Sequence, residues 1–117
     1  MGDGKLLDKI NHVIVYVRDV KKAVRFWSDK VGLKVKEGND DWVELETEGT
    51  ILALHKSPRR VGKDTGINFW VDDIERVYKE LSARGVKFQA PPKKQPWGEK
   101  LTKFYDPERN TFTIEGH

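Results

Sequence analysis

The stretch INHVIVYVRD, residues 10–19, decides the fold of this chain. Its residues alternate, so that three valines fall on one face of an extended strand and a mixed set falls on the other. The valine face comprises Val13, Val15 and Val17, and the mixed face comprises Ile10, His12, Ile14 and Tyr16. Because β-branched residues suit a packed strand surface, we expect the valine face to be buried and the mixed face to remain accessible.

A helical pattern follows this strand directly. Apolar residues recur with the spacing of one helical stripe, and Asp19 stands where it can cap the first turn. Gly32 follows the last apolar residue, as expected just beyond a helix end. The stripe comprises Val20, Ala23, Val24, Trp27 and Val31. The spacing therefore predicts a helix over residues 20–30.

The same block occurs twice in the chain. Residues 17–20, VRDV, match residues 71–74, VDDI, 54 positions later, and the glycine segment GLKV at 32–35 matches GVKF at 85–88. The matched order of strand, Asp cap, apolar stripe and glycine favours true repetition over chance similarity between two βα units, and it predicts a fold built from two similar modules.

Alternating and turn-rich segments supply the remaining elements. We expect three further strands in the first half, and a strand, a helix and three strands in the second. The expected segments are strands at 10–18, 33–36, 42–47, 51–55, 66–71, 86–89, 100–105 and 111–115, and helices at 20–30 and 74–84. The sequence thus predicts an α+β fold, one domain over residues 1–117, in which module one (about 10–56) and module two (about 66–115) are joined by a linker at 57–65. Each module reads βαβββ.

Composition excludes several classes of protein. The 117 residues carry a net charge of +3, and basic and acidic residues are interleaved, so we expect no nucleic-acid partner. The absence of Cys excludes disulfides, thiolate metal sites and a Cys nucleophile. No apolar run is long enough to span a membrane and no signal-peptide pattern is present, so we expect a cytoplasmic protein without a membrane partner.

Two βαβββ modules that open with INHVIVYVRD and close with FYDPERNTFTIE resemble the vicinal oxygen chelate superfamily, which includes glyoxalases, bleomycin-resistance proteins and extradiol dioxygenases. The specific marks are His12 in the first strand, the Val-x-Asp cap in each half, and the Asp-Pro turn before the last strand. The resemblance implies two curved modules that form a glyoxalase-like open barrel around a cavity. It also implies a homodimer, and in the enzymes a divalent metal held by up to four side chains.

The metal positions of that superfamily fall here on His12, Ala53, Gly66 and Thr113, and we expect these four residues to converge on one concave region. Only the first is a good ligand, so we expect no tightly bound metal at the usual point. A shifted site made of His12, His55 and Glu115 is the alternative. His55 and Glu115 lie two strand residues beyond the usual positions, about 6.6 Å away, which argues against a common ion.

Without metal, the resemblance implies an aromatic-rimmed ligand pocket. Trp42 and Trp97 are candidates for its edge or lid, although core packing or a dimer contact would also account for any single tryptophan. Arg59 and Arg60 in the linker could meet an anionic ligand, but a solvated loop accounts for them too. The expected pocket residues are His12, Tyr16, His55, Asn68, Trp70, Thr113 and Glu115.

Two functions remain open from the sequence. The first is a metal-free protein, similar to the bleomycin-resistance branch, that binds a planar or aromatic small molecule in a dimer cleft. The alternative is a divalent-metal-dependent lyase, isomerase/epimerase or dioxygenase that uses His12 with Glu115 and His55. Metal-free catalysis with His12 as general base is a third hypothesis.

Overall fold

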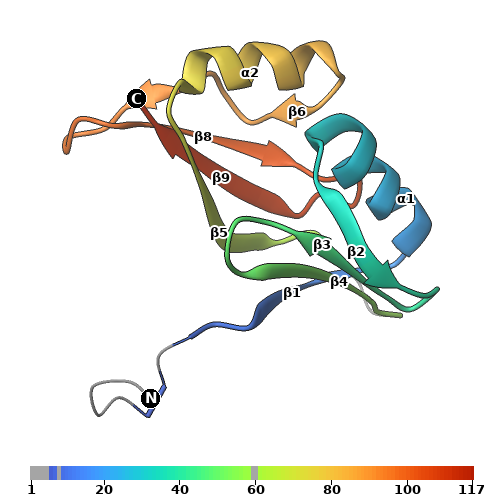
Figure 1. Ribbon diagram of the computed structural model, residues 1–117. Coiled ribbons are helices and arrows are strands. Elements are labelled where there is room, and N and C mark those ends of the chain that lie inside the picture. Colours follow the sequence, from blue (N-terminus) through green and yellow to red (C-terminus); the bar gives the residue numbers. More distant parts are fainter. Residues whose placement is uncertain (1–5, 8, 59–60) are drawn as a thin grey trace.

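A computed structural model describes residues 6–7, 9–58 and 61–117 and arranges them as two mixed sheets around one core (Figure 1). The first sheet has the strand order β1-β4-β3-β2, in which β1 and β4 are parallel and the other pairs are antiparallel. Its module comprises β1 (His12–Val17), α1 (Val20–Arg25), the π-helix η1 (Phe26–Val31), β2 (Lys34–Gly38), β3 (Trp42–Glu46) and β4 (Ile51–Lys56).

The second sheet repeats this plan with the order β5-β9-β8-β6, and the short strand β7 pairs with β8. Here β5 and β9 are the parallel pair. The module comprises β5 (Asp64–Val71), α2 (Ile74–Ala83), β6 (Lys87–Phe88), β7 (Lys93–Lys94), β8 (Lys100–Tyr105) and β9 (Thr111–Gly116). The predicted α+β fold of two βαβββ modules is therefore confirmed.

Both helices begin at the aspartate caps that the sequence predicted. The Asp19 carboxylate accepts a hydrogen bond from the Lys22 backbone N–H at 3.0 Å, and Asp73 caps α2 in the same way through Arg76 at 3.2 Å. The predicted first helix is split, because its last turn widens into η1, where the N–H groups of Gly32 and Leu33 both donate to the Trp27 carbonyl. β7 lies inside a segment predicted as a loop, because two residues are too few to show alternation.

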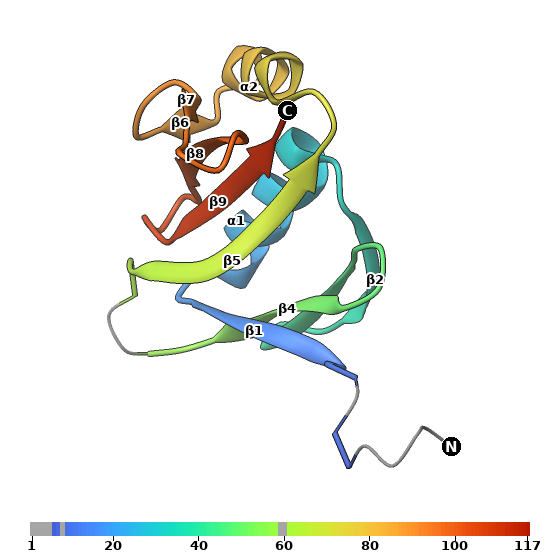
Figure 2. The same ribbon diagram turned by 90° about the vertical axis from the view of Figure 1, so that its left-hand side faces the viewer.

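The core lies between the two sheets, and α1 lies there too (Figures 1 and 2). Val15 and Val17 on the valine face of β1 are buried as predicted, and Val13 is partly buried. Trp27 from η1 joins the modules, because its ring lies 4.8 Å from Phe112 and 5.9 Å from Phe104 of the second sheet. Since the inner faces of both sheets share this core, their outer faces point away from it.

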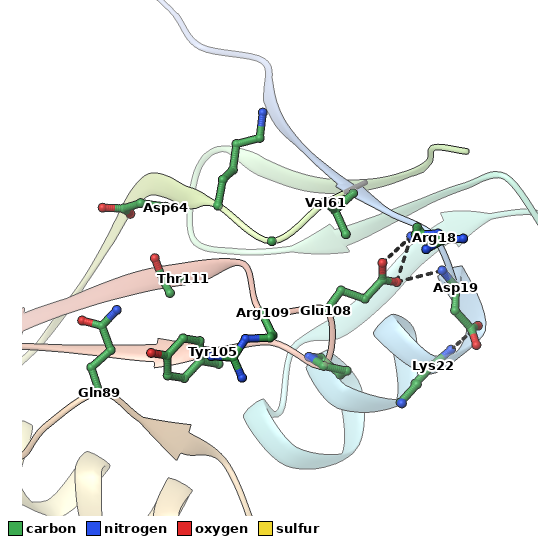
Figure 3. Close-up of a pocket in the computed structure, with 13 residues that line it drawn as sticks. Arg18, Asp19, Lys22, Val61, Asp64, Gln89, Tyr105, Glu108, Arg109 and Thr111 are labelled. Atoms are coloured by element: carbon green, nitrogen blue, oxygen red, sulfur yellow. Dashed lines mark hydrogen bonds between the residues drawn. The ribbon is translucent and has the colours of Figure 1, made fainter. Parts of the chain in front are cut away.

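The turn between β8 and β9 forms a second connection between the modules. The Glu108 carboxylate accepts hydrogen bonds from the backbone N–H groups of Arg18, at 2.6 and 2.8 Å, and of Asp19, at 2.7 Å (Figure 3). Asn110 donates to the Tyr16 carbonyl at 3.4 Å. The Asp-Pro turn that marked the sequence is thus a clasp that holds the second module onto the end of β1.

Candidate functional site

The outer face of the first sheet carries a cluster of rings, which we call the imidazole face: His12, Tyr16, Trp42 and His55. Strand register brings them together, because β4 places His55 between Tyr16 on β1 and Trp42 on β3. The Trp42 ring lies edge-on to both histidines, 5.4 Å from His12 and 5.5 Å from His55. Tyr16 is half exposed and lies 5.6 Å from His55. Three of the predicted pocket residues are therefore neighbours on one accessible surface.

Hydrogen bonds distinguish the two imidazoles of this face. The Asn11 side-chain amide lies 3.0 Å from His12 Nδ1, and since an amide nitrogen only donates, Nδ1 accepts and the neutral ring carries its proton on Nε2. His55 Nδ1 lies 2.9 Å from the Lys56 carbonyl oxygen, which only accepts, so Nδ1 carries the proton and Nε2 is free of it. The face thus offers one donor Nε2–H and one acceptor Nε2.

Glu44 is a member of this surface that the sequence analysis missed. Its carboxylate accepts a hydrogen bond from Trp42 Nε1 at 3.0 Å and lies 4.0 Å from the Lys36 ammonium. In the sheet, Glu44 stands directly opposite Ala53, the position where the superfamily pattern expects a ligand. The sequence could have revealed Glu44, because Trp42 and Glu44 are two positions apart in a strand and therefore share a face.

The outer face of the second sheet, which we call the carboxylate face, carries Asn68, Trp70, Thr113 and Glu115. Register pairs Asn68 with Thr113 and Trp70 with Glu115, in the same relation as Tyr16 with His55 in the first module. Both oxygens of Glu115 are engaged, one by the Asn68 amide and one by Trp97 Nε1, each at 3.0 Å. Trp97 therefore lies against this face, where the sequence placed an edge or lid.

The four positions expected to converge are brought together two by two. His12 and Ala53 lie on the first sheet, and Gly66 and Thr113 lie on the second. Across the described residues, no hydrogen bond, ion pair or ring contact joins the imidazole face to the carboxylate face. Each pair lies on the outer face of its own sheet, and convergence of the two pairs on one concave region stays a prediction.

The proposed shifted metal site would need ligands from both sheets. His12 and His55 each contact the Trp42 ring, and Glu115 lies on the other sheet with both oxygens occupied. Within residues 6–7, 9–58 and 61–117, no three His, Asp or Glu side chains are grouped closely enough to hold a metal ion. The residues of one chain do not fit the superfamily's divalent metal, and we derive no chemistry through it. Arg59 and Arg60 lie outside the described residues.

Comparison with known proteins agrees with this architecture. The family model described as "Glyoxalase/Bleomycin resistance protein/Dioxygenase superfamily" matches residues 9–114. The uncharacterized protein YetH of Bacillus subtilis (strain 168) is 28% identical over 94% of this chain and 99% of its own length.

Solved structures show the same fold. A member of the glyoxalase/bleomycin resistance protein/dioxygenase superfamily from Sphaerobacter thermophilus is 29% identical, with a TM-score of 0.86 over 97% of this chain and all of that one. A structure from Nocardioides described in the same family terms has a TM-score of 0.79 at 21% identity, covering 97% of this chain and 86% of that one. In the described part of the chain, no helix is long and apolar enough to cross a membrane.

Proposed function

The chain belongs to the glyoxalase/bleomycin resistance protein/dioxygenase superfamily, and on this premise we propose that it binds a planar small molecule against the imidazole face, in a cavity completed by a second copy of the chain. The resemblance drawn from the sequence is confirmed at the level of the superfamily. The observation that carries the proposal is the flanking of Trp42 by two imidazoles of opposite hydrogen-bonding character on an accessible surface.

Such a surface matches the chemistry of a planar ligand with polar edges. The Trp42 indole and the half-exposed Tyr16 phenol, with His55 between them, provide apolar contact area. The donor at His12 suits a carbonyl or ring-nitrogen acceptor on the ligand, and the acceptor at His55 suits a hydroxyl or N–H group. A few fixed polar groups around an aromatic floor orient a ligand, which is how small-molecule pockets obtain specificity.

A homodimer accounts for the apolar side chains left on both outer faces. Tyr16 is 50% exposed, Trp70 53% and Trp97 59%, and β1 adds Ile14 at 39%. A two-fold interface would cover these side chains, and two-fold pairs are the commonest oligomers. Light scattering at micromolar concentration should give twice the 13.6 kDa chain mass. A monomer with full ligand affinity would contradict the shared cavity.

The binding experiment begins with a thermal-shift screen of planar aromatic compounds, with bleomycin included. A compound present at 100 times its Kd raises the free energy of unfolding by about 2.7 kcal/mol, which such a screen detects. Trp42→Ala and His12→Ala should each weaken a hit at least about tenfold. Trp97→Phe, which keeps an aromatic ring on the other sheet, is the control. Hits that bind equally to wild type and Trp42→Ala would refute the site.

Of the two histidines, His55 is the one suited to accept a proton. Its Nδ1–H is fixed by the Lys56 carbonyl, which leaves Nε2 as the basic nitrogen. His12, the candidate base from sequence, is instead held by Asn11 as an Nε2–H donor. If turnover of a bound compound is detected, we expect His55→Gln to abolish it and His12→Gln to raise KM with a smaller effect on kcat.

The metal-dependent alternative has its own decisive measurement. We expect elemental analysis of protein purified without chelator or metal-affinity resin to find no stoichiometric divalent metal, because His12 is the one good ligand among the four superfamily positions. One equivalent of metal in wild type, lost in both His12→Ala and Glu115→Ala, would establish the shifted site and overturn this expectation.

A further inference from the structure

A pocket of about 960 Å³ lies at the junction of the two modules, apart from both outer faces (Figure 3). We call it the junction pocket. Its wall combines the end of β1 and the start of α1, the linker at 61–64, and the β8–β9 turn. No residue of the imidazole face or of the carboxylate face lines this pocket. It is therefore a candidate site independent of the proposed function.

The three carboxylates that line this pocket already have partners. Glu108 accepts from the Arg18 and Asp19 backbone N–H groups, and Asp19 accepts from the Lys22 N–H. Asp64 lies 2.7 Å from the Lys103 ammonium, and this hydrogen bond is the main cause that holds the pKa of Asp64 below its usual range. Their lone pairs are thus directed at protein donors.

The carboxylates have partners, but the cations that line the pocket have no oppositely charged partner among the described residues. The side chains of Arg18, Lys22 and Lys63 have no carboxylate within 4 Å among the described residues, and the Arg109 guanidinium lies over the Tyr105 ring at 5.0 Å. Four cations therefore line the pocket against three carboxylates, a formal charge of +1, and Lys103 outside the lining offsets the charge of Asp64. Arginine and lysine without acidic partners, gathered around a concavity, favour an oxyanion.

We propose that the junction pocket binds a phosphate monoester of a small hydroxylated molecule. A phosphate monoester carries a charge of about −1.5 to −2 at pH 7 and three strong acceptor oxygens, which can pair with the cations that have no acidic partner. Figure 3 shows Arg18 and Lys22 at one end of the pocket and Tyr105, Thr111 and Gln89 toward the other, with Arg109 between. The phosphate is therefore placed at the Arg18 end, and hydroxyl groups of the ligand meet the Thr111 hydroxyl and the Gln89 amide.

Isothermal titration at low ionic strength tests this with three probes: glucose 6-phosphate, inorganic phosphate and glucose. We expect glucose 6-phosphate to bind more tightly than inorganic phosphate, and glucose not to bind. Lys22→Gln and Arg109→Gln should each weaken binding of glucose 6-phosphate about five- to tenfold, because each removes one cation from the pocket. The matched control is Lys79→Gln, an exposed lysine on α2 outside the pocket, which should change the Kd less than about twofold.

Three results would overturn the proposal. Wild type that binds neither phosphate has no anion site. An equal loss in Lys79→Gln and Lys22→Gln would show attraction by net charge alone, and equal affinity for inorganic phosphate and glucose 6-phosphate would remove the hydroxylated part of the ligand. Melting curves of each variant check that it is folded. Trp42→Ala should bind glucose 6-phosphate like wild type, which separates failure here from failure of the imidazole-face proposal.

Discussion

Removal of the Glu108 carboxylate should loosen the clasp between the modules. Glu108 satisfies two backbone N–H donors, those of Arg18 and Asp19, with three short contacts of 2.6–2.8 Å. Hydrogen bonds to a charged group contribute about 1.5–3 kcal/mol each, but Arg18 and Asp19 are exposed, so water replaces the carboxylate in the variant and lowers this to about 1 kcal/mol per donor. Glu108→Ala should therefore destabilise the chain by about 2 kcal/mol.

This loss converts to a measurable shift in melting temperature. An unfolding entropy of about 2.1 cal/mol/K per residue gives about 0.25 kcal/mol/K for a chain of this length, so 2 kcal/mol corresponds to about 8 °C. Glu108→Gln keeps one acceptor oxygen and should lose about half as much. The measurement is thermal unfolding by circular dichroism at pH 7, supported by urea denaturation.

The control for this experiment is Glu48→Ala. Glu48 is exposed in the β3–β4 turn and makes no ion pair or side-chain hydrogen bond within the described part of the chain. Its removal should change the free energy of unfolding by less than about 0.5 kcal/mol. A Glu108→Ala protein that melts within about 2 °C of wild type, or a Glu48→Ala protein that loses as much, would refute the clasp.

Three further predictions concern other positions. Burial is the main cause that raises the pKa of Asp106 above 3.8, so the folded chain binds this proton more tightly than the unfolded chain. Urea denaturation should show the stability of wild type, relative to Asp106→Asn, falling as the pH rises through that raised pKa; a rise would contradict the assignment. Trp27 is fully buried and its Nε1–H has no partner among the described residues. Trp27→Ala should cost about 3–5 kcal/mol, and Trp27→Phe less than half of that, because it removes the unpaired N–H and keeps a ring; equal losses would show that ring packing is not what matters. Gly66 has a φ of +73°, so Gly66→Ala should cost about 1 kcal/mol in chemical denaturation although a Cβ there meets nothing within 4 Å, and an unchanged stability would count against the left-handed backbone.

Much of the candidate site was readable from the sequence, because alternation along a strand is a local property. The pattern in residues 10–19 put His12 and Tyr16 on the accessible face, and the repeat put Trp70 in the equivalent place on β5. Strand register makes His55 and Glu115 equivalent neighbours of Tyr16 and Trp70. Glu44 was not predicted as a site residue, although it alternates with Trp42, because the superfamily pattern assigns ligand positions only to the first and last strands of each module.

The sequence by itself determined the elements, their caps and the inner and outer face of each strand, since these depend on residues a few positions apart. Only the tertiary structure decided how the faces combine. Trp27 packs against Phe112 of the other module, and Glu108 reaches a backbone 90 residues away in the chain. The tautomers of His12 and His55, and the unpaired cations of the junction pocket, depend on which partners the folded chain brings within hydrogen-bond distance. No local pattern carries that information, because long-range contacts are selected by the packing of the whole core.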